Sequence, residues 1–366
     1  MAGVYISYPF CGQKCSFCNF ASGPFPRTLA VAYFSALRAE IASHRWSWRP
    51  ETLYLGGGSP GDLDAAAVLG ELIALLPGGP WVEATIEAAP GSITPDRASA
   101  WLRLGINRVS LGVQSFVSAE LARTGRRHDA STVAAEVAVL RQAGIGNFSI
   151  DLIAGLPGQT PESWRESLDW IERLDAPHVS VYMLEIDEDS RLGKEILSGG
   201  KRYGAPEVPS EDAMAELYEV AVDRLGAMGL PRYEISNFAR PGRESRHNLK
   251  YWRLEPYAGF GADAHSFDGA TRSQNVESPV EYVARFKNGV SAQETATPAR
   301  LDQERFYVGL RLMDGLRPTA EEWRRFGGRI QRLAGAGLLQ SDGERLRLTG
   351  RGVLLSNEVF REFIDA

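Results

Sequence analysis

The chain has 366 residues, enough to bury a full hydrophobic core and to divide into one large domain and a smaller one. Hydrophobic residues make up 44% and charged residues 23% of the sequence, the composition of a soluble globular protein. The net charge of -6 offers no basic surface for nucleic acid, and no apolar run approaches the roughly 20 residues of a membrane span. The first residues enter a strand directly, without a signal peptide, so we expect a cytoplasmic protein.

Strand and helix patterns alternate through the first half of the chain. Apolar runs of strand type lie at residues 4–6, 52–55, 82–88, 109–113, 148–153 and 179–184. Helical patterns lie between them, at residues 27–45, 63–76, 94–104, 131–143 and 161–174. Six repeats of strand then helix predict an α/β fold with a parallel sheet. Because eight such units close a full barrel, six predict an incomplete (β/α)6 barrel, with a doubly wound sheet as the alternative.

The middle of the chain changes character. Residues 187–209 are charged and rich in Gly and Pro, which indicates a long loop that could cover the open side of the barrel. A helical pattern over 211–228 follows. Residues 233–268 are dense in aromatic residues, His and Asn but lack regular periodicity, as expected of a segment that wraps a site.

The last part of the chain predicts helices of mixed charge and a hairpin. The helices cover 303–313, 320–326, 330–336 and 350–363, and the hairpin turns at Asp342-Gly343. This order resembles a winged helix, which we interpret as a structural accessory domain because little of it is basic. The predicted domains are therefore a barrel over 1–185, a covering segment over 186–299 and a winged-helix-like domain over 300–366.

All three cysteines, Cys11, Cys15 and Cys18, lie close together after the first predicted strand. Pro9 and Gly12 place them on a loop. An odd number of clustered thiols in a reducing compartment indicates metal binding rather than disulfides. Three sulfurs can bind zinc, which would want a fourth protein ligand, or an iron–sulfur cluster with one iron left open. Three inert buried cysteines are the remaining alternative.

Glycines and polar residues follow several predicted strands at their carboxyl ends, where ligands bind in this architecture. Gly56-Gly57-Gly58-Ser59-Pro60 ends the second strand and lets a ligand approach the main chain, although a tight turn alone also explains it. Glu87 follows the third strand, Gln114 follows the fourth, and Asp151 lies within the fifth. A buried carboxylate such as Asp151 needs a partner, and Arg126 can clamp a carboxylate with two hydrogen bonds.

The cysteine spacing Cys-x3-Cys-x2-Cys, with Phe17 before the last cysteine, resembles the cluster loop of the radical S-adenosylmethionine (SAM) superfamily. The resemblance implies a 4Fe-4S cluster on the three cysteines, with SAM bound to the open iron and cleaved to a 5′-deoxyadenosyl radical. It extends to the coproporphyrinogen-oxidase branch through Gly-Val-Gln-Ser-Phe at 112–116, Ile-Asp-Leu-Ile-Ala-Gly-Leu-Pro-Gly-Gln-Thr at 150–160 and Tyr-Glu-Ile-Ser-Asn-Phe-Ala at 233–239.

The same resemblance implies which residues bind SAM. It assigns the methionine amino group to Gly57, Gly58, Ser59 and Glu87, the SAM carboxylate to Arg126, the ribose hydroxyls to Gln114 and Asp151, and the surroundings of the cluster and adenine to Tyr5 and Phe17. Each of these positions also suits an ordinary polar or core residue. The chain departs from the family at Ser7-Tyr8, where His-Ile is more frequent, and at Ser59, where Thr is usual.

Two features separate the subgroups of this branch. The oxygen-independent coproporphyrinogen III oxidases, enzymes of porphyrin biosynthesis, carry a fourth cysteine where this chain has Phe20. The motif His247-Asn248-Leu249-Lys250-Tyr251-Trp252 resembles the HNxxYW motif of HemW-type heme chaperones, although a structural histidine in an aromatic cluster is the alternative. Imidazole can ligate heme iron while Tyr and Trp pack on the porphyrin. His265 is a second candidate on weaker grounds.

The resemblance therefore implies a heme chaperone that binds a 4Fe-4S cluster, SAM and heme, with heme contacts at His247, Asn248, Tyr251 and Trp252. It also implies transfer of heme to an acceptor protein, such as a membrane respiratory enzyme. A coproporphyrinogen III oxidase is the alternative function. The sequence leaves open whether SAM is cleaved and whether the chain forms a homodimer.

Overall fold

The computed structural model of the protein describes residues 2–63 and 65–364. Its centre is a mixed 11-stranded sheet with the order β11-β10-β9-β8-β1-β2-β3-β4-β5-β6-β7. The strands are β1 (Ala2–Tyr8), β2 (Pro50–Gly57), β3 (Glu83–Ala88), β4 (Arg108–Gln114), β5 (Asn147–Ala154), β6 (His178–Met183), β7 (Asn237–Ala239), β8 (Tyr257–Phe260), β9 (His265–Phe267), β10 (Thr271–Asn275) and β11 (Gln293–Pro298).

The six predicted strands correspond to β1–β6, which pair in parallel and in chain order. Chain order without a reversal is the order of a barrel wall rather than of a doubly wound sheet. The incomplete barrel is therefore confirmed. Strand β8 adds a seventh parallel strand beside β1, and antiparallel strands extend both edges, β7 beside β6 and β9–β11 beyond β8.

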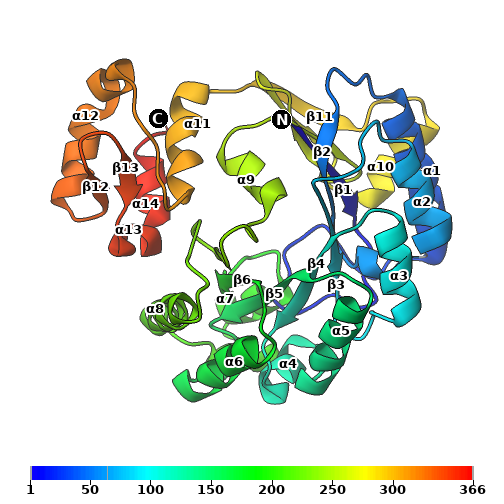
Figure 1. Ribbon diagram of the computed structural model, residues 1–366, viewed down its shortest axis with the longest axis horizontal. Coiled ribbons are helices and arrows are strands. Elements are labelled where there is room, and N and C mark those ends of the chain that lie inside the picture. Colours follow the sequence, from blue (N-terminus) through cyan, green and yellow to red (C-terminus); the bar gives the residue numbers. More distant parts are fainter. Residues whose placement is uncertain (1, 64, 365–366) are drawn as a thin grey trace.

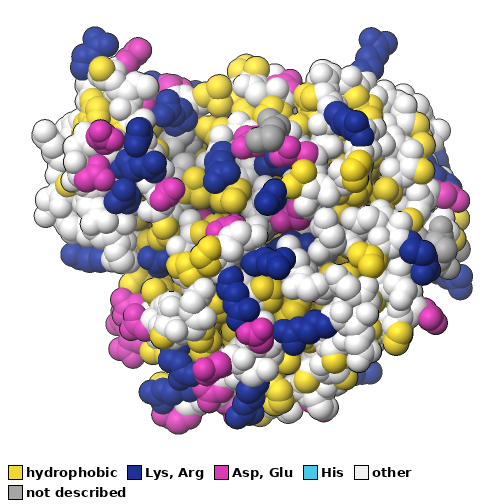
Figure 2. All heavy atoms as spheres, viewed as in Figure 1, with side chains coloured by type: hydrophobic (Ala, Val, Ile, Leu, Met, Phe, Trp, Pro, Cys, Tyr) yellow, Lys and Arg dark blue, Asp and Glu magenta, His cyan; other side chains and the backbone are white. Residues whose placement is uncertain are grey.

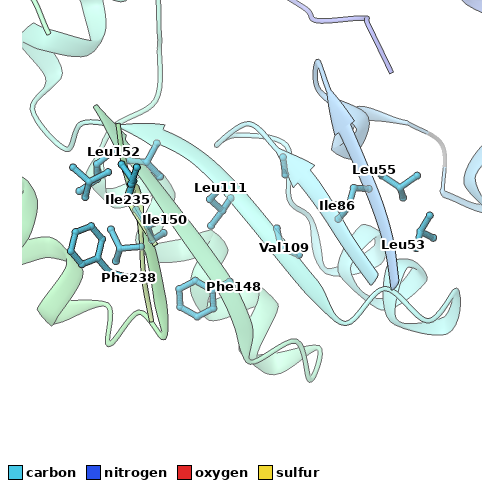
Figure 3. Close-up of a cluster of buried hydrophobic side chains, with 14 of the residues drawn as sticks. Leu53, Leu55, Ile86, Val109, Leu111, Phe148, Ile150, Leu152, Ile235 and Phe238 are labelled. Atoms are coloured by element: carbon cyan, nitrogen blue, oxygen red, sulfur yellow. The ribbon is translucent and has the colours of Figure 1, made fainter. Parts of the chain in front are cut away.

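Helices cover the outer face of the barrel wall (Figure 1). They are α1 (Arg27–Ser43), α2 (Gly70–Ala74), α3 (Pro95–Arg103), α4 (Ser118–Thr124), α5 (Ala130–Gln142), α6 (Pro161–Arg173) and α8 (Glu211–Ala227). Alternate residues of each strand face them, so Val109, Leu111 and Val113 of β4 are fully buried in the main core. Figure 3 shows Val109 and Leu111 of this layer, together with Leu53, Ile86 and Phe148 of other strands. The other face of β4 carries Arg108, Ser110 and Gln114, which turn polar groups toward the barrel interior.

Two segments differ from their predicted irregular structure. Residues 187–209 contain the short helix α7 (Arg191–Leu197), capped by the Ser190 hydroxyl, which accepts from the Gly193 amide at 2.9 Å. Residues 233–268 contain β7, β8, β9 and the helix α9 (Arg246–Trp252). Their regular structure depends on distant partners: β8 joins the sheet only through β1 and β9. Such pairing leaves no local periodicity in the sequence.

The C-terminal region packs around Phe306, Phe326 and Phe363, whose ring centroids are 4.5–5.5 Å apart and which extend the main hydrophobic core. Its elements are α11 (Leu301–Tyr307), α12 (Ala320–Gly335), β12 (Leu339–Ser341), β13 (Leu346–Leu348), α13 (Gly350–Leu354) and α14 (Ser356–Arg361). The hairpin is confirmed, but the helices predicted at 320–326 and 330–336 are one helix, since Gly327 and Gly328 do not interrupt it. The last predicted helix breaks at Leu355. The domain bounds themselves stay a prediction.

Two helices differ from the sequence prediction. The pattern over 63–76 includes residue 64, which lies outside the described residues, and the regular part is a π turn over Ala65–Leu69 followed by α2. The helix α10 (Pro279–Lys287) had no predicted counterpart; it packs on α1, where Tyr282 donates a hydrogen bond to Glu40 at 2.5 Å.

The surface mixes charges of both signs. On the face drawn in Figure 2, basic and acidic side chains are interspersed. Within residues 2–63 and 65–364, no helix has the length and apolar character needed to cross a membrane.

Candidate functional site

The cysteine loop leaves the carboxyl end of β1 and is tied to three other positions in the chain. The Cys11 amide donates to the Gly23 carbonyl at 3.0 Å, and the Ser16 amide donates to the Thr124 carbonyl at 3.1 Å. The Leu192 amide at the start of α7 donates to the Ser16 carbonyl at 2.8 Å. The segment predicted to be a covering loop therefore supports the cysteine loop.

The three thiols are free and half-buried. Burial raises the pKa of Cys11, and the neighbouring Cys18 and Cys15 raise it further, while hydroxyls of Ser22 and Ser59 lower it. Within the described residues, no three His, Cys, Asp or Glu side chains converge where they could hold one metal ion. Zinc needs its ligands around one ion, whereas the thiolates of a 4Fe-4S cluster bind separate irons. Three partly exposed thiols on one loop fit the cluster better.

The Gly57-Gly58-Ser59 segment lies against the cysteine loop through its main chain. The Gly58 amide donates to the Tyr8 carbonyl at 2.7 Å, and the Ser59 amide donates to the Phe10 carbonyl at 3.0 Å. Gly57 has φ +103°, which favours glycine. These bonds place the glycine segment and the cysteines at the same end of the barrel.

Glu87 lies half-buried at the carboxyl end of β3. Its carboxylate accepts from the Tyr54 hydroxyl at 2.9 Å and from the Gly57 amide at 3.1 Å. Burial raises the pKa of Glu87 to about 7, and the charge of Asp151 acts in the same direction. Near neutral pH this carboxyl group is therefore divided between its charged and neutral forms.

Gln114 and Arg126 lie together over Gly112 of β4. A side chain at Gly112 would meet Gln114 Nε2 at 3.1 Å and Arg126 Nη2 at 3.4 Å. Gln114 itself has φ +73°, an unusual backbone angle for this residue type. Arg126 donates to the Gly112 carbonyl at 2.6 Å, and its buried Nε has no partner. Because no carboxylate of the described residues pairs with Arg126, its guanidinium can take one from a ligand.

Asp151 finds its partners among hydroxyls and not at Arg126. Ser110 donates to Oδ2 at 3.0 Å and Ser149 donates to Oδ1 at 3.1 Å. Burial raises the pKa of Asp151, while these serines, Ser180 and the charge of Arg108 oppose the rise. The carboxylate is therefore held in a fixed orientation on the inner face of β5.

The two predicted aromatic residues flank this region. Tyr5, on β1, stacks on Tyr54 with ring centroids 6.1 Å apart. Phe17, in the cysteine loop, packs on a second apolar cluster that includes Ile153 and Leu156 of the β5 end. The predicted cluster and SAM residues thus gather around one end of the barrel, although their contacts with a ligand stay a prediction.

The predicted heme motif lies at the other end of the same strands. Its helix α9 packs on Gly3 of β1 and Thr52 of β2, near the amino ends of both. From there to Tyr8, the last residue of β1, is roughly 17 Å along an extended strand. The structure therefore separates the heme motif from the cysteine loop along these strands.

His247 is fully buried, and both of its ring nitrogens are hydrogen-bonded. Nδ1 bonds to the Thr52 hydroxyl at 2.9 Å and Nε2 to the Tyr251 hydroxyl at 2.8 Å. Burial lowers the pKa of His247 to about 3, and the nearby charges of Lys250 and Arg108 add to this effect. The imidazole is neutral, and neither nitrogen can bind an iron while α9 holds this position.

The other motif residues are more accessible. Trp252 is half-buried, its Nε1 has no partner, and the guanidinium of Arg311 lies 4.4 Å above its ring. The Asn248 amide donates to the Ser245 hydroxyl, which caps α9. His265 is exposed on β9.

Sequence reasoning missed a set of polar residues inside the barrel, among them Tyr54, Ser110, Ser149, His178 and Tyr233. The alternation of β4–β6 carried a signal for the strand residues, because Arg108-x-Ser110, Ser149-x-Asp151 and His178-x-Ser180 place polar groups on one face.

Comparisons with known proteins identify the family of the chain. The profile of the Radical SAM superfamily matches residues 5–171. The heme chaperone HemW of Bacillus subtilis (strain 168) is 33% identical, with 100% of this chain and 99% of that protein covered. The heme chaperone HemW of Lactococcus lactis subsp. lactis (strain IL1403) is 32% identical over 99% of this chain and 97% of that protein.

A solved structure gives the fold. The coproporphyrinogen III oxidase HemN from Escherichia coli, a radical SAM enzyme, superimposes with a TM-score of 0.84 at 23% identity, covering 99% of this chain and 89% of that one. At this identity the match shows the fold and not the activity. The full-length similarity to HemW proteins is the more specific finding. The chain belongs to the radical SAM superfamily and, within it, to the HemW family.

Proposed function

We propose that this protein is a heme chaperone that binds a 4Fe-4S cluster, SAM and heme and transfers heme to an acceptor protein. The observation that carries the proposal is similarity along the whole chain to proteins named heme chaperones. The local sequence supports it: Phe20 stands where the oxidases have a fourth cysteine, and its side chain is 65% exposed.

In this proposal Cys11, Cys15 and Cys18 would hold the cluster, which would supply the reducing chemistry toward bound SAM. Glu87 and the Gly57-Gly58-Ser59 segment take the amino group of SAM, and Arg126 takes its carboxylate. Gln114 and Asp151 take the ribose hydroxyls, and Tyr5 and Phe17 flank the cluster and adenine. The guanidinium of Arg126, which pairs with no carboxylate of the described residues, supports the carboxylate assignment.

Heme binding at the motif needs a conformational step. Three motif residues of α9 are partly exposed, namely Asn248, Tyr251 and Trp252. His247, in contrast, must break its hydrogen bonds to Thr52 and Tyr251 before a ring nitrogen can reach the heme iron. Exposed His265 is the alternative ligand.

The test is to purify the protein anaerobically with a reconstituted cluster and to measure heme binding and coproporphyrinogen III decarboxylation side by side. We expect a heme Soret band and no carbon dioxide release under reducing conditions. Replacing His247 with Ala should perturb the Soret band and leave the cluster intact. If instead His265→Ala perturbs it and His247→Ala does not, the ligand assignment moves to β9. SAM-dependent conversion of coproporphyrinogen III to protoporphyrinogen IX at enzymatic turnover would establish the oxidase alternative.

A further inference from the structure

A continuous chain of buried hydrogen bonds links the start of α9 to Asp151. The Ser245 amide bonds to the Tyr233 hydroxyl at 3.2 Å, and that hydroxyl bonds to His178 Nε2 at 2.9 Å. His178 Nδ1 bonds to the Ser149 hydroxyl at 2.8 Å, and Ser149 bonds to Asp151 Oδ1 at 3.1 Å. The chain crosses the barrel interior from its amino end toward the predicted SAM site.

The chemistry of these groups fixes the direction of the chain. An ionised Asp151 can only accept, so Ser149 donates to it and accepts from His178 Nδ1, which leaves Nε2 to accept the Tyr233 proton. His178 is 1% exposed, and burial lowers its pKa well below its usual range, so the ring is neutral and carries its proton on Nδ1. That proton goes to Ser149, whose own proton is then free for Asp151. Every donor points toward the carboxylate.

The start of this hydrogen-bond chain, at Ser245, is held in place by a second carboxylate. Glu83, the first residue of β3, is 2% exposed and accepts the amides of Arg246 at 3.0 Å and His247 at 2.9 Å. Two amides at a helix start satisfy a buried carboxylate well. Glu83 therefore fixes α9, and with it Ser245, against the barrel wall.

A shorter route connects α9 to the other predicted SAM carboxylate. The His247 ring packs on the Tyr54 ring with centroids 5.3 Å apart, and the Tyr54 hydroxyl donates to Glu87 at 2.9 Å. The seat of His247 leaves no space: a side chain at Gly3 would lie 2.9 Å from Thr52 Oγ1 and 3.0 Å from the His247 ring. The position of the Tyr54 ring, and through its hydroxyl that of the Glu87 carboxylate, depends on His247 remaining in this buried position.

We propose that α9 supports the SAM site structurally. The carboxylates of Asp151 and Glu87 are oriented by four positioning residues, namely His178, Tyr233, Tyr54 and His247. This inference rests on the proposed function, because the roles of Asp151 and Glu87 toward SAM come from it. A fixed carboxylate offers its free lone pairs to a ligand without the entropic cost of being ordered on binding.

The test compares hydroxyl deletions that keep the aromatic ring. In the full-length protein with reconstituted cluster, Tyr233→Phe breaks the chain to Asp151 and Tyr54→Phe breaks the bond to Glu87. Each should weaken SAM binding by roughly three- to tenfold in calorimetry, the range of one neutral hydrogen bond. Tyr218→Phe is the matched control, since that buried hydroxyl donates to the Ile235 carbonyl outside both routes. It should lower stability without changing SAM affinity.

Combined substitutions distinguish positioning from general destabilisation. Tyr233→Phe and Ser149→Ala interrupt the same chain, so their effects on SAM affinity should be less than additive. Tyr233→Phe and Tyr54→Phe act on different carboxylates and should come close to adding. Equal SAM affinity in the wild type and the Tyr233→Phe and Tyr54→Phe variants, with the same loss of stability as Tyr218→Phe, would overturn the proposal.

A measurement without SAM separates this inference from the proposed function. Nitrogen NMR of the imidazoles should show His178 neutral with its proton on Nδ1 in the wild type, and that form should weaken in Ser149→Ala. A proton on Nε2 would contradict the chain regardless of SAM. Absence of SAM binding by the wild-type protein would instead refute the proposed function, and the positioning roles with it.

Discussion

The carbonyl oxygen of Phe10 lies where a side chain on Gly58 would begin: an added Cβ would be 2.5 Å from it. The Tyr8 carbonyl lies 2.7 Å from the same point. Glycine at this position lets the end of β2 hydrogen-bond to the cysteine loop. Gly58→Ala should therefore push the loop away and cost about 1–3 kcal/mol of folding stability, the usual cost of overpacking.

Iron and sulfide content after reconstitution, with urea unfolding, measures this effect. Gly12→Ala is the matched control in the cysteine loop, because no atom lies within 4 Å of its added Cβ. We expect Gly12→Ala to keep the cluster and Gly58→Ala to lose part of it. Equal iron content in both variants would show that the contact with Phe10 does not hold the loop.

Replacement of a single cysteine should abolish the cluster. Three thiolates leave one of the four irons without a protein sulfur, so Cys15→Ala would leave two such irons. We expect loss of the full complement of iron and sulfide and of the charge-transfer absorption. Ser16→Ala is the control, since the Ser16 hydroxyl is buried without a hydrogen-bond partner. A full cluster in Cys15→Ala would end the cluster assignment.

Arg126→Ala should weaken SAM binding by about 1.5–3 kcal/mol, the value of a charge-assisted hydrogen bond. The loss arises because no carboxylate within residues 2–63 and 65–364 pairs with the guanidinium to compensate. Calorimetry on the reconstituted protein measures it. The neighbouring Arg127 is exposed, so Arg127→Ala should bind SAM as the wild type does. Unchanged affinity in Arg126→Ala would contradict the carboxylate assignment.

SAM affinity should depend on pH through Glu87. Its pKa is raised to about 7, so the carboxylate is partly protonated at neutral pH and becomes a full acceptor above it. Affinity should therefore increase as pH rises from about 6 to about 8 and level off once ionisation is complete. Glu87→Gln, which cannot ionise, should bind more weakly and lose this dependence. The same pH profile in Glu87→Gln would show that another group controls binding.

Much of this fold could be predicted because its signals are local. The buried runs at Val109 and Ile150 alternate with polar residues, and short loops connect them to amphipathic helices. The place of α9 could not be predicted. The position of α9 depends on contacts of His247 with Gly3 and Thr52. No sequence pattern around Gly3 or Thr52 indicates a contact with residue 247. The HNxxYW resemblance predicts a heme role for these residues and gives no indication that His247 is buried.

The cysteine loop likewise combines features that the sequence predicts with features that it does not. Cysteine spacing indicates the ligands directly, since the geometry of a cluster restricts it. The support from Thr124 and Leu192 comes from main-chain groups of distant segments, which can be supplied by almost any residue type and so leave no trace in composition.

Strand β1 lies in the interior of the sheet, paired with β2 on one side and with β8 on the other, so that Val4 is flanked by Leu53 and Ala258. A ribosome adding about 5–20 residues per second needs roughly 10 to 50 seconds to pass from one of these strands to the other. Throughout that interval the nascent chain already carries its three cysteines, while the β8 edge of β1 remains unpaired. Delivery of iron and sulfide to the thiols thus has time to precede completion of the barrel during translation.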